Sequence, residues 1–174
     1  MPSEAPKAPP RLRPARAGDA RAVRDLVFGT LREYGLDPDP VRTDSDLDRF
    51  PARYVEAGGA FDVLEDPNGT VVGCVGLMPL GDGVVELRKM YLVRGCRGRG
   101  QGRRLLEHAL EAAAERGYRR VELETAGPLR EAQALYESYG FAPFESDRLS
   151  SRCDRAYRLD LPAKPREHAA GAGD

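Results

Sequence analysis

The chain has 174 residues, 41% of them hydrophobic and 32% charged, which is typical of one globular domain that buries its own core. We expect that domain over residues 11–161, with disordered tails at 1–10 and 162–174. The 27 basic and 28 acidic side chains give a net charge of −1, which argues against a nucleic-acid partner. Three cysteines without metal-like spacing argue against disulfides and a metal site. The absence of a long apolar run or signal core predicts a cytoplasmic protein without a membrane partner.

The first third of the chain alternates a short strand with helical patterns. Residues 12–15 form the strand, and a helix capped by Asp19 follows to about Tyr34. The apolar stripe of this helix consists of Val23, Leu26, Val27 and Leu31. Two Asp-Pro pairs at 37–40 end it, and a second helical pattern covers about 46–56.

The middle of the chain predicts an antiparallel meander. Residues 61–64 and 71–78 read as a hairpin around the turn Asp66-Pro67-Asn68-Gly69. A Gly-Asp-Gly turn then leads into a fourth strand at 84–93, which is rich in valine and large apolar residues.

The last third predicts a strand–helix–strand unit. An amphipathic helix ends at Gly117 and is followed by a strand at 121–125 and a helix at 130–139. Residues 141–144 and 155–161 form a final strand pair. The whole order predicts a mixed α/β (α+β) sheet.

A glycine-rich loop, Arg97-Gly98-Arg99-Gly100-Gln101-Gly102, joins the fourth strand to its helix. Such a loop brings bare backbone N–H groups close to a phosphate, with a helix N-terminus behind them. No Lys-Ser or Lys-Thr follows, so the loop is not a P-loop. Arg103 stands at the third glycine position of a dinucleotide fingerprint, which argues against that alternative also. A solvated surface turn is the remaining structural alternative.

Arginines cluster around this loop and raise the alternative of a nucleic-acid patch. Because the chain as a whole carries no basic excess, one small polyphosphate ligand suits the cluster better. The cluster consists of Arg94, Arg97, Arg99, Arg103 and Arg104.

The pattern Arg-x-x-Gly-x-Gly, formed by Arg97, Gly100 and Gly102, resembles the acetyl-CoA signature of the GNAT superfamily of N-acetyltransferases. Glu86 lies 11 residues before Arg97, where many members of that family carry a general base. The segment Ala134–Phe141, ALYESYGF, is similar to the family motif A-L-Y-E-x-x-G-F. Three signatures in the right order are more specific than any one of them.

The resemblance implies a mostly antiparallel sheet of six to seven strands with about four helices, in which the fourth and fifth strands splay apart. It implies acetyl-CoA as acetyl donor, with the pantetheine arm along the fourth strand and the pyrophosphate in the loop. The residues that it assigns to the donor are Tyr91, Leu92, Val93, Arg97, Gly98, Arg99, Gly100, Gln101, Gly102 and Arg103.

Transfer to an amine needs a base for the attacking nitrogen and an acid for the leaving thiolate. Glu86 is the candidate base, and a structural pair with Arg88 is its alternative. Tyr136 matches the motif tyrosine that lies near the CoA sulfur, and a hydroxyl with a pKa of ~10 remains protonated at neutral pH. Strand alternation predicts Glu86, Arg88 and Met90 on one face, so Arg88 is a candidate ligand for an acceptor carboxylate.

The acceptor class stays open at this point. The segment 33–48 carries six acidic residues, whose charge would favour a cationic acceptor unless they form a solvated loop. A small-molecule amine or an amino acid is the main hypothesis, and a protein acceptor or a catalytically silent acyl-CoA sensor are the alternatives. A homodimer is left open.

Overall fold

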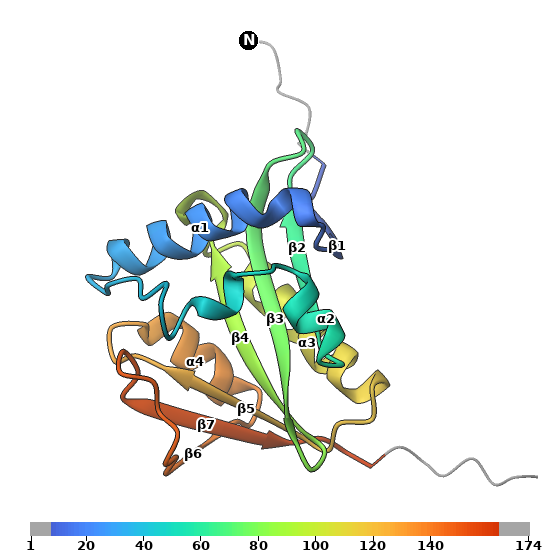
Figure 1. The fold of residues 1–174 in the computed structure, drawn as a ribbon, viewed down its shortest axis with the longest axis vertical. Helices are drawn as coiled ribbons and strands as arrows, with labels where there is room; N and C mark the ends of the chain where they lie inside the picture. The colour runs from blue at the N-terminus through green and yellow to red at the C-terminus, as the bar shows by residue number, and fades with distance from the viewer. Residues whose placement is uncertain (1–7, 164–174) are drawn as a thin grey trace, which may run out of the picture.

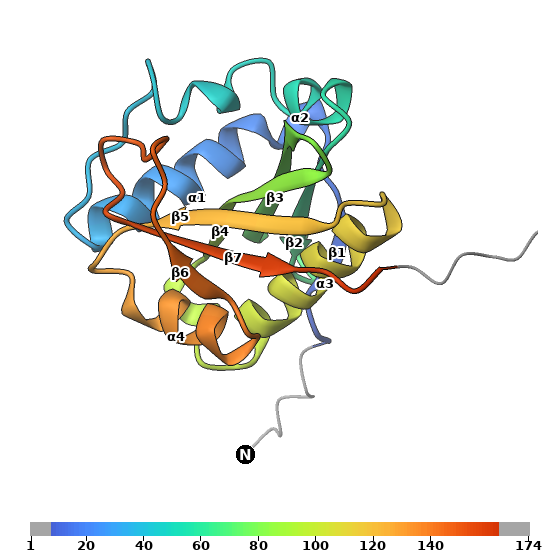
Figure 2. The same cartoon turned by 90° about the horizontal axis from the view of Figure 1, so that it is seen from below.

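The computed structural model describes residues 8–163. Most of the two tails predicted at 1–10 and 162–174 therefore lies outside the described residues. Seven strands form one sheet in the order β1-β2-β3-β4-β5-β7-β6 (Figures 1 and 2). The strands are β1 (Arg11–Pro14), β2 (Ala60–Glu65), β3 (Val71–Gly81), β4 (Val84–Leu92), β5 (Arg120–Thr125), β6 (Ala142–Phe144) and β7 (Arg155–Asp160). The helices are α1 (Ala20–Glu33), α2 (Ala52–Glu56), α3 (Gln101–Glu115) and α4 (Arg130–Ser138), with short 3-10 turns η1 (Ala17–Asp19), η2 (Ser45–Leu47) and η3 (Arg94–Cys96). All pairs are antiparallel except β4–β5, so the predicted fold is confirmed.

Helices cover both faces of the sheet (Figures 1 and 2). On one face, Leu105 and Leu106 of α3 and Tyr136 of α4 pack on the sheet. On the other, Val27 of α1 and Tyr54 of α2 form a second core. The sheet is therefore the middle of three layers, which is how an amphipathic helix buries its apolar stripe.

Two local predictions need correction. The helix expected at 46–56 is two pieces, η2 and α2, because Asp48 is extended and Pro51 supplies no N–H for a continuous helix. Asp19 precedes α1 as expected, but its carboxylate accepts the Arg16 N–H at 2.7 Å and pairs with Arg13, so it caps η1 rather than α1.

A β-bulge interrupts β4 where it passes β3. Cys74 lies opposite Tyr91 and Gly76 opposite Arg88, so β4 has one residue more than β3 in this interval. Lys89 takes the left-handed conformation, with φ of 52°. The extra residue reverses the alternation. Met90 therefore packs in the α3–α4 core, away from Arg88, and the prediction that they share a face is wrong.

β4 and β5 are paired over three residues only, from Val84↔Arg120 to Glu86↔Glu122. β4 then continues to Leu92 and β5 to Thr125 without further pairing between them. The predicted splay is confirmed, and it begins at Glu86.

Gly76 on β3 gives a test of the packing on the α2 face. A Cβ at this position would lie 2.7 Å from Tyr54 Cε1 and 2.9 Å from Phe61 Cδ2, both atoms of buried rings. We expect Gly76→Ala to lower the free energy of unfolding by about 1–3 kcal/mol, the usual cost of overpacking a core. Gly18→Ala, where a Cβ meets nothing within 4 Å, is the control in the same urea titration. Equal stability of the two variants would contradict the packing described here.

Candidate active site

The glycine loop holds a row of backbone N–H groups without internal acceptors. Gly98 and Gly100 have φ of 70° and 78°, a conformation that glycine adopts without steric cost. The first N–H of this stretch that reaches a backbone carbonyl is that of Arg104, 3.1 Å from the Gly100 oxygen. No side chain caps α3. The N–H groups of residues 98–103 are therefore available to an anion at the positive end of the helix.

Arg97 fastens this loop to its surroundings. Its guanidinium donates two hydrogen bonds to the Leu92 carbonyl, at 3.0 and 2.8 Å, and one to Glu33 of α1 at 2.8 Å. It also lies 5.4 Å from the centre of the Tyr34 ring. The arginine of the signature thus connects the end of β4 to α1 and holds the loop in place.

The other predicted donor residues divide between the cleft and its surroundings. Tyr91, Leu92, Gly98, Gly100, Gly102 and Arg103 line the cleft together with Arg97, whereas Val93, Arg99 and Gln101 do not. The Val93 N–H is bonded to the Val72 carbonyl at 2.9 Å.

A single cleft of about 810 Å³ runs from this loop through the opening between β4 and β5 to the α2 face. β4 contributes Glu86–Leu92, β5 contributes Glu122–Thr125, and α4 contributes Tyr136. The loop between β6 and β7 closes one side with Arg148 and Arg152. All three candidate chemical residues, Glu86, Arg88 and Tyr136, therefore border the same space.

Glu86 and Arg88 form an ion pair. Arg88 Nε and Nη2 donate to the two carboxylate oxygens of Glu86 at 2.7 and 3.3 Å. Glu86 is opposite Glu122 in the register, at the last paired position before the strands separate. Glu86 thus forms the ion pair with Arg88 that was the structural alternative to a role as base, and the same carboxylate also borders the cleft.

Tyr136 is 5% exposed and packs against Phe141, with ring centres 5.7 Å apart. Burial raises the pKa of its hydroxyl well above the ordinary value of 10. No hydrogen bond from this hydroxyl to another group of residues 8–163 is present, although the side chain lines the cleft. The group is therefore a protonated donor with a free direction toward the cleft.

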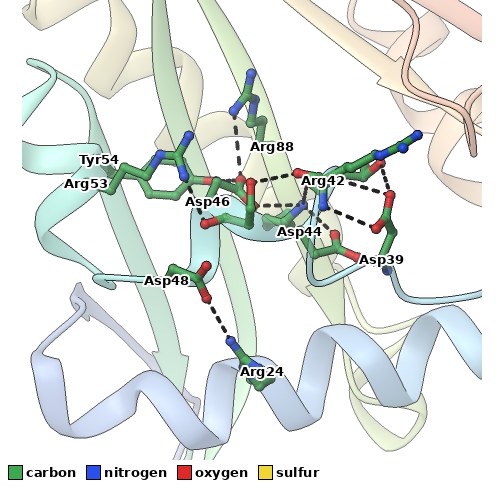
Figure 3. A network of polar contacts seen from close by, with 12 residues as sticks. Arg24, Asp39, Arg42, Asp44, Asp46, Asp48, Arg53, Tyr54 and Arg88 are labelled. Carbon is green, nitrogen blue, oxygen red and sulfur yellow. Dashed lines mark hydrogen bonds and ion pairs between the residues drawn. The ribbon is translucent and has the colours of Figure 1, made fainter.

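The sequence did not indicate a buried charge cluster behind Arg88, formed by Asp44, Lys89 and Arg152. Lys89 Nζ lies 2.7 Å from Asp44 Oδ1, and Arg152 donates to both Asp44 oxygens at 2.9 and 3.0 Å. Burial by itself raises the pKa of the Asp44 carboxyl, but the hydrogen bonds and charges of Arg152 and Lys89 outweigh it and hold the pKa at about 2. The Asp44 end of this network is seen in Figure 3. The cluster ties the segment before α2 to β4 and to the β6–β7 loop.

Asp46 extends this network toward Tyr54 and Arg88. It accepts a short hydrogen bond from the Tyr54 hydroxyl and lies 3.9 Å from Arg88 Nη1 (Figure 3). The nearest sequence signal for this charge network is the adjacent pair Arg88-Lys89. Consecutive residues of a regular strand point to opposite faces, so two charges in a row are compatible with an interruption of the strand by a bulge. The partners themselves are 45 and 108 residues from Asp44, too far apart for any local pattern to reveal.

Cys74, Cys96 and Cys153 are unpaired, and residues 8–163 hold no group of acidic, histidine or cysteine side chains arranged for a metal. In the same range, no helix combines the length and the apolar character needed to cross a bilayer.

Comparison with known proteins gives the family. The model of the acetyltransferase (GNAT) family matches residues 24–141. The uncharacterised N-acetyltransferase YjgM of Escherichia coli is 38% identical over 137 residues, covering 76% of this chain and 81% of its own length. A GNAT-family acetyltransferase structure from Staphylococcus aureus superposes with a TM-score of 0.81 at 22% identity, over 88% of this chain and 99% of its own. The chain belongs to the GNAT acetyltransferase family, whose chemistry is acyl transfer.

A second solved structure carries a ligand. The phosphinothricin acetyltransferase of Sinorhizobium meliloti, in complex with AcCoA, superposes with a TM-score of 0.70 at 20% identity, over 92% of this chain and 95% of its own. At this identity the likeness concerns the fold.

Asp44 gives a test of the buried cluster. Asp44→Asn leaves Lys89 and Arg152 charged without their shared carboxylate, so we expect a loss of about 3–5 kcal/mol of unfolding free energy at pH 7. Because the native pKa of about 2 lies below the ordinary 3.8, the stabilisation is present above about pH 4 and is lost as the pH falls from there through about 2. Urea unfolding as a function of pH measures both effects.

The matched control is Asp48→Asn, which removes an exposed carboxylate that pairs with Arg24 at 3.2 Å. Its cost should stay below about 1 kcal/mol, as for most surface pairs. The double variant Asp44→Asn/Arg152→Gln should recover part of the loss, because one unpaired charge is removed. An Asp44→Asn protein as stable as Asp48→Asn would contradict the role of the cluster.

Proposed function

We propose that this protein transfers an acetyl group from acetyl-CoA to the primary amine of a small molecule or amino acid, by direct attack in a ternary complex. The observation that carries the proposal is the continuous cleft, which connects the anion-binding loop to Glu86 and Tyr136 through the opening between β4 and β5. Donor and acceptor can approach one point from opposite faces of the sheet in such a passage.

The residues of the loop fit a CoA donor. Six consecutive backbone N–H groups, at 98–103, supply the positive partial charge that a pyrophosphate needs. The unpaired inner edge of β4 near Tyr91 and Leu92 can pair with the amides of a pantetheine arm, as an added strand would. The AcCoA held by the S. meliloti neighbour supports the same donor for this chain.

Glu86 and Tyr136 supply the two proton transfers in this proposal. The amine nitrogen forms a bond to the thioester carbonyl carbon, and its proton passes to the Glu86 carboxylate, directly or through one water. The carbon–sulfur bond breaks, and the Tyr136 hydroxyl donates its proton to the departing thiolate. The raised pKa of Tyr136 keeps that proton in place through the neutral and mildly alkaline range.

Arg88 has a double role in the same scheme. Two of its nitrogens orient the Glu86 carboxylate, and Nη1 lies 3.9 Å from Asp46, beyond hydrogen-bond distance. This nitrogen is the one available to a carboxylate of the acceptor.

The acid–base assignment predicts how two conservative variants behave. Glu86→Gln and Tyr136→Phe should each lower kcat by about 10²–10⁴, the usual contribution of a positioned acid or base. The dissociation constant of acetyl-CoA should not change, because neither side chain belongs to the loop. Thiol release with a panel of amines measures the first quantity and calorimetry the second.

Tight acetyl-CoA binding without turnover of any amine would indicate the catalytically silent sensor instead. Retention of full kcat in Tyr136→Phe would show that another group protonates the thiolate.

The loop geometry yields a separate prediction. Gly100→Ala places a Cβ at φ of 78°, which costs about 1–2 kcal/mol and displaces the N–H groups of the first turn of α3. We expect CoA itself to bind about tenfold more weakly, since 1.4 kcal/mol is a factor of ten. Gly95→Ala, outside the loop and with open space around its Cβ, is the control. Equal affinity of the two variants for CoA would argue against the loop as the pyrophosphate site.

A further inference from the structure

The segment between α1 and α2 presents the opposite charge to the cleft from the one its sequence suggests. Most of its acidic side chains are engaged elsewhere: Asp44 and Asp46 are buried in the charge network, and Asp48 pairs with Arg24, while Asp37 does not border the cleft. Asp39 accepts the N–H groups of Arg42 and Thr43. Of all these carboxylates only Asp46 borders the cleft. The sequence expectation that the acidity of this segment attracts a cationic acceptor therefore loses its structural basis.

Two arginines, Arg42 and Arg53, border the cleft from the same segment and from α2. We call this pair the arginine rim. Both residues are exposed, and both bond to Ser45. The Ser45 hydroxyl donates to the backbone carbonyl of Arg42 at 2.7 Å, and the Ser45 carbonyl accepts from the Arg53 guanidinium at 2.9 Å. In Figure 3 the two guanidinium groups lie on opposite sides of Asp46, with Arg88 between them.

The other cations at this end of the cleft already have carboxylate partners. Lys89 and Arg152 share Asp44, and Arg148 lies 3.5 Å from Glu122. Arg88 pairs with Glu86 through two of its nitrogens, so only its Nη1 can join the arginine rim in binding an acceptor acid. Neither member of the arginine rim forms an ion pair with a carboxylate of residues 8–163. Among the described residues that border this end of the cleft, Arg42 and Arg53 are therefore arginines that can still form an ion pair with an anionic ligand.

The negative charge of this end lies deeper, where the strands separate. Glu86 and Glu122 are register partners on β4 and β5, with side chains 16% and 14% exposed. Glu86 and Glu122 are already paired with Arg88 and Arg148, so the unpaired arginines at the mouth leave this end of the cleft with a surplus of positive charge. An amine bearing an acidic group complements both ends.

We propose that the acceptor is a primary amine that carries an anionic acid group, a carboxylate or a phosphonate, and that the arginine rim binds this group while the amine faces Glu86. The inference rests on the proposed function and specifies its acceptor. It adds Arg42 and Arg53 to the binding residues, because guanidinium groups recognise carboxylate and phosphonate oxygens through paired hydrogen bonds.

The test compares amines of similar length that differ in the distal group. The panel is 3-aminopropanoate, 3-aminopropanamide, 2-aminoethylphosphonate and 1,3-diaminopropane, together with L-alanine and L-alaninamide. Thiol release from acetyl-CoA gives kcat/KM, expressed per concentration of neutral amine so that different amine pKa values do not bias the comparison. Acids should exceed their amides by about tenfold, the effect of one charge-assisted hydrogen bond of about 1.4 kcal/mol. The carboxylate and phosphonate members distinguish the two sources of the anion.

Arg42→Ala and Arg53→Ala should each reduce this preference, by raising KM for the acids more than KM for the amides. Arg21→Ala is the matched control, because its side chain on α1 is 94% exposed and does not border the cleft. A merely structural role of either arginine would change KM for acids and amides alike.

Two further outcomes separate the inference from the function on which it rests. Equal or better turnover of amides and the diamine would overturn the inference and leave the acetyltransferase intact. If no amine is acetylated, calorimetric titration of the CoA-saturated protein with each acid and its amide decides the point independently. A preference for the acids that Arg42→Ala and Arg53→Ala reduce would then support the arginine rim, and equal binding would overturn it.

Discussion

The separation of β4 from β5 after three residue pairs is the constraint on which the rest of the site depends. Each strand keeps a partner on its outer edge, β3 for β4 and β7 for β5, so the sheet stays intact while two inner edges lose their backbone bonds. Unpaired backbone groups need a partner or solvent. The opening therefore creates both a passage through the sheet and a row of groups that can bind a ligand in extended conformation. Glu86 lies at the point where it begins.

Charge, more than apolar packing, holds the acceptor end of this passage together. The bulge at Lys89 directs two consecutive cations, Arg88 and Lys89, toward the segment before α2. Arg152 reaches the same carboxylate, Asp44, from the β6–β7 loop. Removing Asp44 is costly, since within the described part of the chain Arg152 then remains charged without a carboxylate partner and Lys89 keeps only Asp46, at 3.3 Å. This requirement fixes strand β4 and two loops relative to one another and gives the cleft a defined wall.

The same internal pairing decides which charges remain available to a ligand at the cleft. A segment with many carboxylates contributes little negative charge to the cleft, because those carboxylates satisfy buried cations, turns and a neighbouring helix. The two members of the arginine rim, to which the sequence analysis assigned no role, are arginines without a carboxylate partner among the described residues. Electrostatic complementarity with a substrate therefore depends on which charges remain after internal pairing, a quantity that composition does not contain.

The sequence by itself determined the order of elements, the α/β class and the glycine-rich loop between β4 and α3. Hydrophobic periodicity is a local property, and the strand–glycine loop–helix pattern lies within one contiguous stretch from Val84 to Gly117. Glu86 and Tyr136, which two of the signatures single out, both border one cleft. Boundaries failed where single residues interrupt a pattern, as at Pro51 and at the bulge of β4.

Only the tertiary structure decided the acceptor side. Asp44, Lys89 and Arg152 come together across 45 and 108 residues of chain, and no local rule links residues at such separations. The pairing of Glu86 with Arg88 was one possibility in the sequence, and the side-chain geometry shows that it is present on a carboxylate that also borders the cleft. Local periodicity encodes which faces are buried, whereas the partners of a buried charge depend on which distant segments the fold brings to the same place.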